Sequence, residues 1–268
     1  MRVAALQFDV RRGATRENLA AVEAGLREAA QRGIELVVLP EMWPSSFPGP
    51  RADLAALIEA DANSWRRVEE LSRELSLAVA GSGFGAQPGN LPRNRARLVS
   101  RGTTLLEYDK VHLFSPTAET ESFSGGELPP PTVDFAGARV ACLVCYDLRF
   151  PELTRRTFLD GAELLCVSAQ WPLARAPHWR ALVLGLAVQN QCFVVACNRT
   201  GTDVIGRREL VLEFPGNSLL ASPHGVVLAE GTLQDTLVAA ELDLELVREL
   251  RRRVPVARDR RPELYSRW

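Results

Sequence analysis

The sequence has almost no lysine. Lys110 is the only lysine among its 32 Lys and Arg residues. A codon bias towards arginine explains such a count, and under that bias a lysine persists best where arginine cannot replace it. Lysine carries a compact point charge with three donors, whereas arginine carries a planar fork. Lys110 is therefore a candidate for chemistry, although the chance survival of one surface lysine would produce the same count.

Other absences exclude whole classes of protein. The net charge is only -1, which argues against a general binder of nucleic acid or other polyanions. No apolar stretch approaches the length of a membrane span. The apolar run before Asp9 and Arg11 is too short for a signal peptide. Five cysteines, an odd number in a long chain, do not indicate a secreted disulfide framework. We therefore expect a cytoplasmic protein without a nucleic-acid or membrane partner.

The remaining composition is that of a globular protein. The chain has 268 residues, 46% of them hydrophobic, which is enough to bury a large core. Short apolar runs alternate with helical patterns, which predicts an α/β fold. We expect one domain over residues 1–245, followed by a C-terminal helix and tail over residues 246–268 that belong to the same unit.

Strands and helices are predicted from apolar periodicity and capping residues. The predicted strands are Arg2–Phe8, Glu35–Leu39, Leu77–Gly81, Asn94–Ser100, Thr103–Tyr108, Arg139–Val144, Leu164–Ser168, Phe193–Asn198, Asn217–Ala221, Val226–Ala229 and Leu237–Leu242. The predicted helices are Thr15–Gly33 with Thr15 as N-cap, Ser64–Glu74, Pro151–Asp160, His178–Gln191 and Leu244–Arg253. The glycine-rich segment Gly81–Gly85 is interpreted as a turn, and Ser115–Pro131 as a long functional loop.

Reactive side chains follow three of these strands. Glu41 comes after the strand that ends at Leu39, Lys110 after Tyr108, and Cys145 after Val144. Active sites of α/β sheets gather beyond the carboxyl ends of strands. The three side chains would supply a base, a positive charge and a nucleophile at one place.

These residue types suit attack on an amide carbonyl. A free thiol has a pKa of about 8.5, so a nearby ammonium is needed to favour the thiolate, or a carboxylate to accept its proton. The tetrahedral oxyanion needs donors, which Lys110 and a backbone N–H would supply. Glu41 would then protonate the leaving amine and activate water for hydrolysis of the thioester.

Three motifs carry a specific resemblance to a known family, and three further segments extend it. The motifs are Leu39–Met42, Tyr108–Phe114 and Val144–Glu152, and the further segments are Ala169–Pro172, Gln189–Asn190 and Cys197–Arg199. In this order and spacing they resemble the nitrilase superfamily of carbon–nitrogen hydrolases. The resemblance implies an αββα sandwich and a homodimer or higher homo-oligomer that needs no cofactor or metal.

The resemblance also implies roles for individual residues. Glu41 matches the general base, Lys110 the oxyanion lysine and Cys145 the nucleophile. A second glutamate is implied in the loop after the lysine. Glu119 fits it best, and Glu121 is the alternative.

Three further residues are implied to surround the substrate. The backbone N–H of Tyr146 would be the second oxyanion donor, and Trp171 would line the pocket. Phe123 completes the local pattern around the second glutamate and is expected at the substrate.

The motif at the cysteine points to one branch of the superfamily. Cys145–Glu152 reads Cys-Tyr-Asp-Leu-Arg-Phe-Pro-Glu, which resembles the omega-amidases that cleave amides of small dicarboxylic acids such as 2-oxoglutaramate. Hydrolysis of deaminated glutathione or of N-carbamoyl amino acids remains an alternative within the superfamily. Acyl transfer to an amine and a catalytically silent scaffold also remain open.

The remaining cysteines and histidines are interpreted as structural. Cys142, Cys166, Cys192 and Cys197 lie in or beside apolar strands and are expected in the core. The three histidines lack the spacing of metal ligands, and His112 is expected to orient the loop after Lys110. Arg149 and Glu152 are expected to make polar contacts at the start of the helix after Cys145, and Asn198–Arg199 to shape a strand end.

Overall fold

Two six-stranded sheets lie face to face in the computed structural model, which describes residues 1–87, 89–205, 208–234, 236–265 and 267. The first sheet has the order β14-β1-β2-β3-β4-β5, and the second β13-β12-β9-β8-β7-β6. The strands of the first sheet are β1 (Arg2–Gln7), β2 (Leu36–Val38), β3 (Ala78–Gly85), β4 (Arg93–Ser100), β5 (Thr103–Asp109) and β14 (Thr236–Glu241). Those of the second are β6 (Val133–Phe135), β7 (Ala138–Val144), β8 (Leu164–Ser168), β9 (Phe193–Cys197), β12 (Leu219–Ala221) and β13 (Val227–Glu230).

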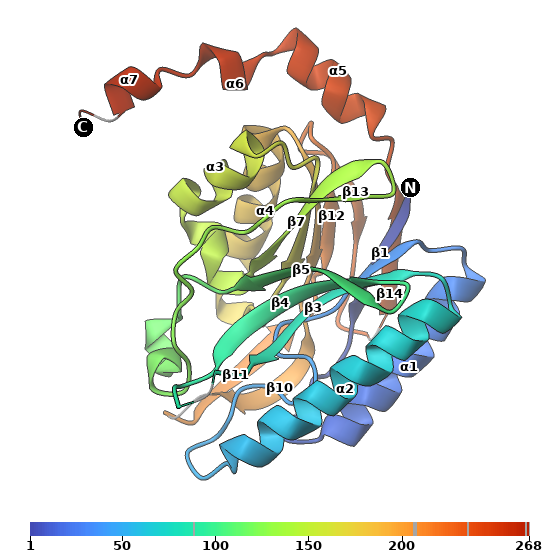
Figure 1. Cartoon of the computed structure of the whole chain (residues 1–268), viewed down its shortest axis with the longest axis vertical. Helices are drawn as coiled ribbons and strands as arrows, with labels where there is room; N and C mark the ends of the chain where they lie inside the picture. Colours follow the sequence, from blue (N-terminus) through green and yellow to red (C-terminus); the bar gives the residue numbers. More distant parts are fainter. Residues whose placement is uncertain (88, 206–207, 235, 266, 268) are drawn as a thin grey trace.

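Helices cover the outer face of each sheet (Figure 1). The helices α1 (Thr15–Gln31) and α2 (Leu54–Glu74) pack on the first sheet, and α3 (Pro151–Leu159) and α4 (Ala176–Asn190) on the second. This arrangement confirms the predicted αββα sandwich. Inside each sheet the central strands β1-β2-β3 and β7-β8-β9 run parallel, so their carboxyl ends meet at one edge.

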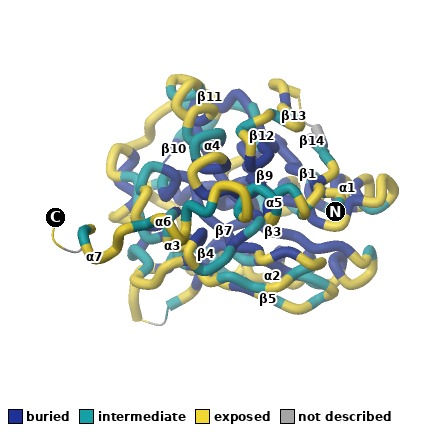
Figure 2. Tube along the Cα trace, turned by 90° about the horizontal axis from the view of Figure 1, so that it is seen from above, coloured by how far each residue is buried: buried dark blue, intermediate teal, exposed yellow. Residues whose placement is uncertain are grey.

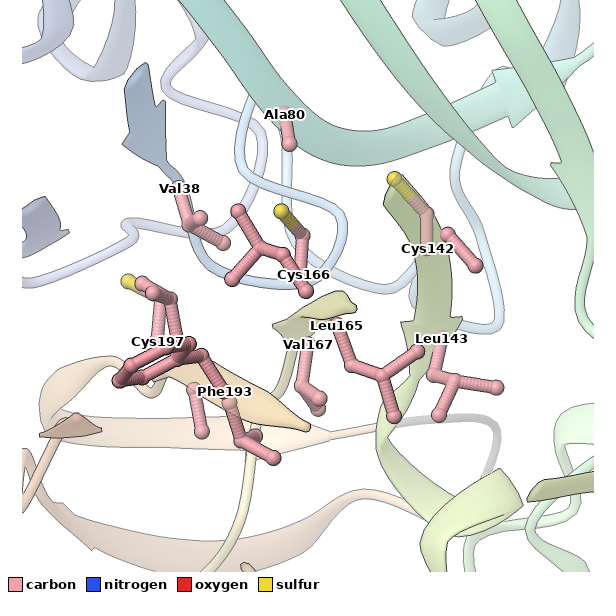
Figure 3. Close-up of a cluster of buried hydrophobic side chains, with 14 of the residues drawn as sticks. Val38, Ala80, Cys142, Leu143, Leu165, Cys166, Val167, Phe193 and Cys197 are labelled. Atoms are coloured by element: carbon pink, nitrogen blue, oxygen red, sulfur yellow. The ribbon is translucent and has the colours of Figure 1, made fainter. Parts of the chain in front are cut away.

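The core lies on both sides of the second sheet. Figure 3 shows Cys142 and Cys166 on the side of Val38 and Ala80, which belong to the first sheet, while Leu143 and other alternate residues point away from it. The central strands of both sheets form the buried centre of the molecule in Figure 2, whereas the edge strands β5 and β13 are partly exposed. A strand buried on both faces explains why the apolar runs are continuous rather than alternating.

The chain ends in three short helices. These are α5 (Glu245–Arg253), α6 (Val256–Asp259) and α7 (Pro262–Tyr265), and the last of them extends away from the body (Figure 1, Figure 2). Arg251 fastens α5 by donating hydrogen bonds to the carbonyls of Gly161, Ala162 and Gln191. Ser266 and Trp268, at the end of the predicted tail, lie outside the described residues.

The structure corrects the predicted start of two helices. α2 begins at Leu54 rather than Ser64, because Asp53 caps it by accepting a hydrogen bond from the Ala56 N–H, ahead of a run of good helix formers. Thr15 is the first residue of α1 and not its cap, a position that Ala14 takes without a side-chain hydrogen bond.

Other corrections concern strands. Gly81–Gly85 is not a turn but the second half of β3. A Cβ at Gly83 would collide with Asp61, so glycine here permits α2 to approach the sheet. The hairpin of β10 (Thr200–Ile205) and β11 (Leu210–Pro215), and the short β6, were not predicted. Ser115–Pro131 is a loop, as expected, but it contains two 3₁₀ turns, Ser115–Thr117 and Glu119–Glu121.

Candidate active site

A pocket opens where the ends of three strands meet. Glu41 follows β2, Lys110 follows β5 directly, and Cys145 follows β7. All three line this pocket together with Glu119. The structure therefore brings together the four side chains that the sequence singles out for catalysis.

Lys110 lies between two carboxylates. Its Nζ donates to Glu41 Oε1 at 2.8 Å and to Glu119 Oε1 and Oε2 at 2.9 and 2.8 Å. The exposed fractions of Lys110, Glu41 and Glu119 are 1%, 1% and 2%. The only lysine is thus fully buried, and three carboxylate oxygens around one nitrogen match the three donors of an ammonium.

Glu119 rather than Glu121 holds this position. Glu119 Oε2 also accepts a hydrogen bond from the Phe114 N–H at 2.6 Å, which ties the loop after Lys110 to the cluster. Glu121 is exposed. The 3₁₀ turn over Glu119–Glu121 directs the two carboxylates to different environments.

Two residues hold Glu41 in place. Asn94 Nδ2 donates to Glu41 Oε1 at 2.8 Å and approaches Glu119 Oε1 at 3.3 Å. The Gln170 N–H donates to Glu41 Oε2 at 3.1 Å, and Gln170 Nε2 donates to the Glu41 carbonyl at 2.9 Å. Glu41 therefore lies in a fixed orientation within a buried site.

The charges of the cluster set its protonation. Burial lowers the pKa of Lys110, but the negative charges of Glu119 and Glu41 outweigh it and hold that pKa above its usual value. Burial raises the pKa of Glu119, and the positive charge of Lys110 opposes that rise. Lys110 stays an ammonium at neutral pH.

Cys145 is held as a thiol. Burial raises its pKa well above the ordinary value, and the negative charge of Glu41 raises it further, while Lys110 acts in the opposite direction. The sequence leads us to expect that a nearby ammonium favours the thiolate or that a carboxylate accepts the thiol proton, and the direction of the pKa shift supports the second route. At the thiol, burial and the negative charge of Glu41 together outweigh the positive charge of Lys110.

The backbone presents Cys145 at a sharp turn. Its φ is 44°, in the left-handed region that residues with a side chain rarely adopt, and a 3₁₀ turn over Cys145–Arg149 follows. Asp147 secures this turn by accepting hydrogen bonds from Tyr108 Oη at 2.8 Å and from the His112 N–H at 3.1 Å. His112 Nδ1 lies 3.0 Å from the same carboxylate, in agreement with the loop-orienting role expected of it.

Two of the three predicted substrate contacts line the pocket. Tyr146 and Trp171 do so, whereas Phe123 is not among the described lining residues. Phe123 is buried behind the pocket, stacked on Phe84 with ring centroids 5.4 Å apart and in edge contact with Phe47. Phe47 is the aromatic residue that reaches the pocket from this cluster.

Four residues in or beside the pocket were not identified as functional from the sequence. Asn94 carries no recognisable signal, since it is one polar residue at the start of a strand. Gln170 and Asp147 lie within the family-like segments, which identify the neighbourhood but not their hydrogen bonds. Arg175 follows Trp171 closely in the sequence, and its place on the pocket wall depends on the 3₁₀ turn Leu173–Arg175.

Arg149 and Asn198 also have defined places. Arg149 lines the pocket and lies over the Trp171 ring, 4.8 Å from its centroid, rather than serving only the start of α3. Asn198 fixes the strand end near the pocket by accepting from the Trp171 N–H and donating to the Trp171 carbonyl. Arg199 is buried and pairs with Asp9 and Asp203.

No group of three or more His, Cys, Asp or Glu side chains within the described part of the chain is arranged to hold a metal ion. All five cysteines are buried and free. In the same described residues, no helix has both the length and the apolar character needed to cross a membrane.

Comparisons with known proteins assign the family. The profile of the carbon-nitrogen hydrolases matches residues 2–252. The chain therefore belongs to the carbon-nitrogen hydrolase family, which confirms the resemblance to the nitrilase superfamily.

Curated relatives narrow the class. The chain is 35% identical over 266 residues to a 2-oxoglutaramate amidase of Bacillus subtilis (strain 168), covering 98% of both chains. It is 34% identical over 229 residues to the omega-amidase YafV of Escherichia coli (strain K12), covering 85% of this chain and 84% of that protein. These similarities support the predicted omega-amidase branch.

A solved amidase has the same fold. A variant of the amidase from Nesterenkonia sp. AN1, with the acetamide moiety of fluoroacetamide added covalently at its active-site cysteine, superimposes with a TM-score of 0.85 at 26% identity, covering 100% of this chain and 96% of that one. Another variant of that amidase, in complex with butyramide, gives a TM-score of 0.84 at 26% identity, covering 100% and 97% of the two chains. The protein is accordingly a cysteine-dependent amide hydrolase.

Proposed function

We propose that the protein hydrolyses the omega-amide of a small dicarboxylic acid, such as 2-oxoglutaramate, through a thioester on Cys145. The observation that carries the chemistry is the burial of one ammonium between two carboxylates beside the Cys145 thiol. The substrate class is supported by the omega-amidases and the 2-oxoglutaramate amidase among the relatives.

The first step forms the acyl-enzyme. The Cys145 sulfur attacks the amide carbonyl while the thiol proton passes to the Glu41 carboxylate. Proton transfer accompanies the attack, because the raised pKa of Cys145 disfavours a free thiolate beforehand. The resulting oxyanion is stabilised by the Lys110 charge and by the Tyr146 N–H.

Collapse of this intermediate releases ammonia. Glu41 returns the proton to the nitrogen as the carbon–nitrogen bond breaks, which leaves the acyl group on sulfur. A water molecule then gives its proton to Glu41 and attacks the thioester. The carbon–sulfur bond breaks, Cys145 takes the proton back, and the carboxylic acid leaves.

Glu119 acts through Lys110. Both of its oxygens accept hydrogen bonds from the ammonium, so it keeps Lys110 protonated and in place while Glu41 changes its protonation state. A second carboxylate is needed because Glu41 loses its negative charge each time it takes a proton. Without Glu119, the buried ammonium would then have no charged partner.

Ammonia release from purified protein tests the proposal. The panel consists of 2-oxoglutaramate, succinamate, deaminated glutathione, an N-carbamoyl amino acid and a simple nitrile, each with wild type, Cys145→Ala and, as a matched control, Cys166→Ala. Cys166 is buried in the core away from the pocket. We expect turnover of a dicarboxylate amide that Cys145→Ala abolishes and Cys166→Ala retains. Turnover confined to the N-carbamoyl substrate, or full turnover by Cys145→Ala, would contradict the proposal.

We also infer a homodimer or higher homo-oligomer and a cytoplasmic location, as the family resemblance and the sequence lead us to expect. Light scattering of the purified protein measures the first, and fractionation of the source cells the second. A monomer at all concentrations, or recovery outside the cytoplasm, would contradict these inferences.

A further inference from the structure

The pocket contains two arginines that face no carboxylate. The positive charge of Lys110 is already matched by Glu41 and Glu119. Among the described residues that line the pocket, the only other cations are Arg149 and Arg175. Neither forms an ion pair with a described acidic residue, although both are partly buried.

The Arg149 guanidinium nevertheless has two partners within the protein. Its guanidinium lies 4.8 Å from the centroid of the Trp171 ring, and its Nη2 donates to His178 Nδ1 at 3.2 Å. These contacts hold Arg149 against the pocket wall, and they hold the Trp171 ring in return. Arg149 is therefore a part of the wall rather than a free donor.

Arg175 is in a different position. Its guanidinium lies over the Phe114 ring, 5.4 Å from the centroid, and within the described chain it donates no hydrogen bond to a protein acceptor. Its backbone is fixed, because the Arg175 carbonyl accepts a hydrogen bond from Trp171 Nε1 at 2.8 Å. Several other partly or fully buried arginines do have oxygen partners, among them Arg95, Arg97, Arg199 and Arg251. A half-buried guanidinium without an oxygen partner suits an anion that arrives with a ligand.

The rest of the pocket dictates how such an anion would lie. The β10–β11 hairpin supplies an apolar wall of Ile205, Leu212 and Phe214. The floor carries the Glu41 and Glu119 carboxylates, which repel a second negative charge. A substrate with an amide at one end and a carboxylate at the other can therefore place only its amide at Cys145.

We propose that Arg175 binds the free carboxylate of the substrate and so selects mono-amides of short dicarboxylic acids over neutral amides. This inference rests on the proposed function, since it assumes that the amide is cleaved at Cys145. Arg175 is the specificity-determining residue, and its guanidinium lies over the Phe114 ring in the pocket that also contains Cys145.

Two substrates of the same length test the role of Arg175. Succinamate and butyramide differ only in a carboxylate that replaces a methyl group. The quantity to measure is the ratio of kcat/KM for succinamate to kcat/KM for butyramide. We expect Arg175→Met to lower this ratio about 10- to 100-fold, as the loss of one charge-assisted hydrogen-bonded contact implies, mainly through KM for succinamate. Arg175→Lys should recover part of the ratio, because it keeps the charge but not the fork.

Two controls make the result specific. Arg180 lies on α4, pairs with Glu230 at 2.7 Å and does not line the pocket, so Arg180→Met should leave the ratio as in wild type. Arg149→Met should lower both rates by a similar factor, because it releases the Trp171 ring. A ratio unchanged in Arg175→Met, or lowered only in Arg149→Met, would overturn the inference.

The proposed function and this inference fail in different ways. If wild type hydrolyses neither amide, the proposed function fails. If both are hydrolysed and the ratio is insensitive to Arg175, only the inference fails. Should Arg175→Met not fold, the wild type alone decides: added salt should raise KM for succinamate but not for butyramide. Equal salt dependence for the two substrates would overturn the inference.

Discussion

Replacing Lys110 by arginine keeps the positive charge and changes the shape and size of the group that carries it. In the structure, one nitrogen faces three carboxylate oxygens at 2.8 to 2.9 Å, and the Phe47 ring lies on another side with its centroid at 5.9 Å. A guanidinium spreads its donors over three nitrogens in a plane and cannot reproduce this arrangement from the same backbone. It is also larger, and because Lys110 is 1% exposed, a guanidinium would have to displace the groups around it or enter the pocket that the substrate occupies.

This geometry sets the expected loss of unfolding free energy and the expected loss of kcat. Overpacking of a buried site costs about 1–3 kcal/mol of unfolding free energy. Displacement of an oxyanion-stabilising donor costs about 10²- to 10³-fold in kcat. We therefore expect Lys110→Arg to remain folded, with a moderately lower urea midpoint, and to lose about 10²- to 10³-fold in kcat for ammonia release.

A control must show that exchanging arginine and lysine outside the pocket does not itself change kcat. Arg180→Lys, on the exposed surface of α4, makes the reverse change outside the pocket and should be neutral. Lys110→Met, which removes the charge, should cost more stability, about 3–5 kcal/mol, because it leaves two buried carboxylates without a cation. A kcat for Lys110→Arg within a few-fold of wild type would refute the reasoning about the single lysine.

Three further predictions concern single groups. Glu119→Gln should lower kcat/KM more than 10-fold in the ammonia assay, as expected when a buried charged contact is lost. The control Glu121→Gln, at an exposed residue, should match wild type. Equal effects of the two variants would contradict the assignment of Glu119 as the second glutamate. The rate of iodoacetamide labelling of Cys145 should keep rising with pH beyond the range in which ordinary thiols titrate. Glu41→Gln should shift this pH profile to lower pH, because it removes a negative charge that raises the pKa of Cys145. An unshifted profile would contradict this effect of Glu41 on Cys145. Burial raises the pKa of Asp61 to about 7, so the unfolded state releases its proton first and stability should fall as pH rises from about 4 to 7, by about 4 kcal/mol. Urea unfolding at pH 5 and pH 8 should show about 3 kcal/mol of this loss in wild type, because the rest occurs below pH 5, and none of it in Asp61→Asn; parallel curves for the two proteins would exclude it.

The position of the site was predictable because strand ends are recognisable in the sequence. Continuous apolar runs identify β2 and β7, while β5 mixes polar and apolar residues, and each of the three is followed by one reactive side chain. β5 runs parallel to β2 and β3, since it is separated from β3 by one antiparallel strand, so Glu41 and Lys110 meet at the same edge. Local patterns alone therefore located Glu41, Lys110 and Cys145.

The finer arrangement depends on contacts between distant segments. Glu119 and Glu121 are indistinguishable by composition, and only the 3₁₀ turn directs one inward. The direction in which the pKa of Cys145 shifts could not be predicted, because the effect of one ammonium cannot be weighed until the burial of the thiol and its neighbouring carboxylates are known. Phe123 was placed at the substrate from its neighbours in sequence, whereas Phe47, from a remote loop, occupies that side of the pocket.

Direct observation of the acyl-enzyme tests the central claim. Wild type is mixed with succinamate, quenched in acid during turnover, digested and analysed by mass spectrometry, with Cys145→Ala treated in parallel. We predict one succinyl group on the peptide that contains Cys145, and its removal by hydroxylamine, as expected of a thioester. Continued ammonia release by Cys145→Ala, or an acyl group on another residue, would contradict the account.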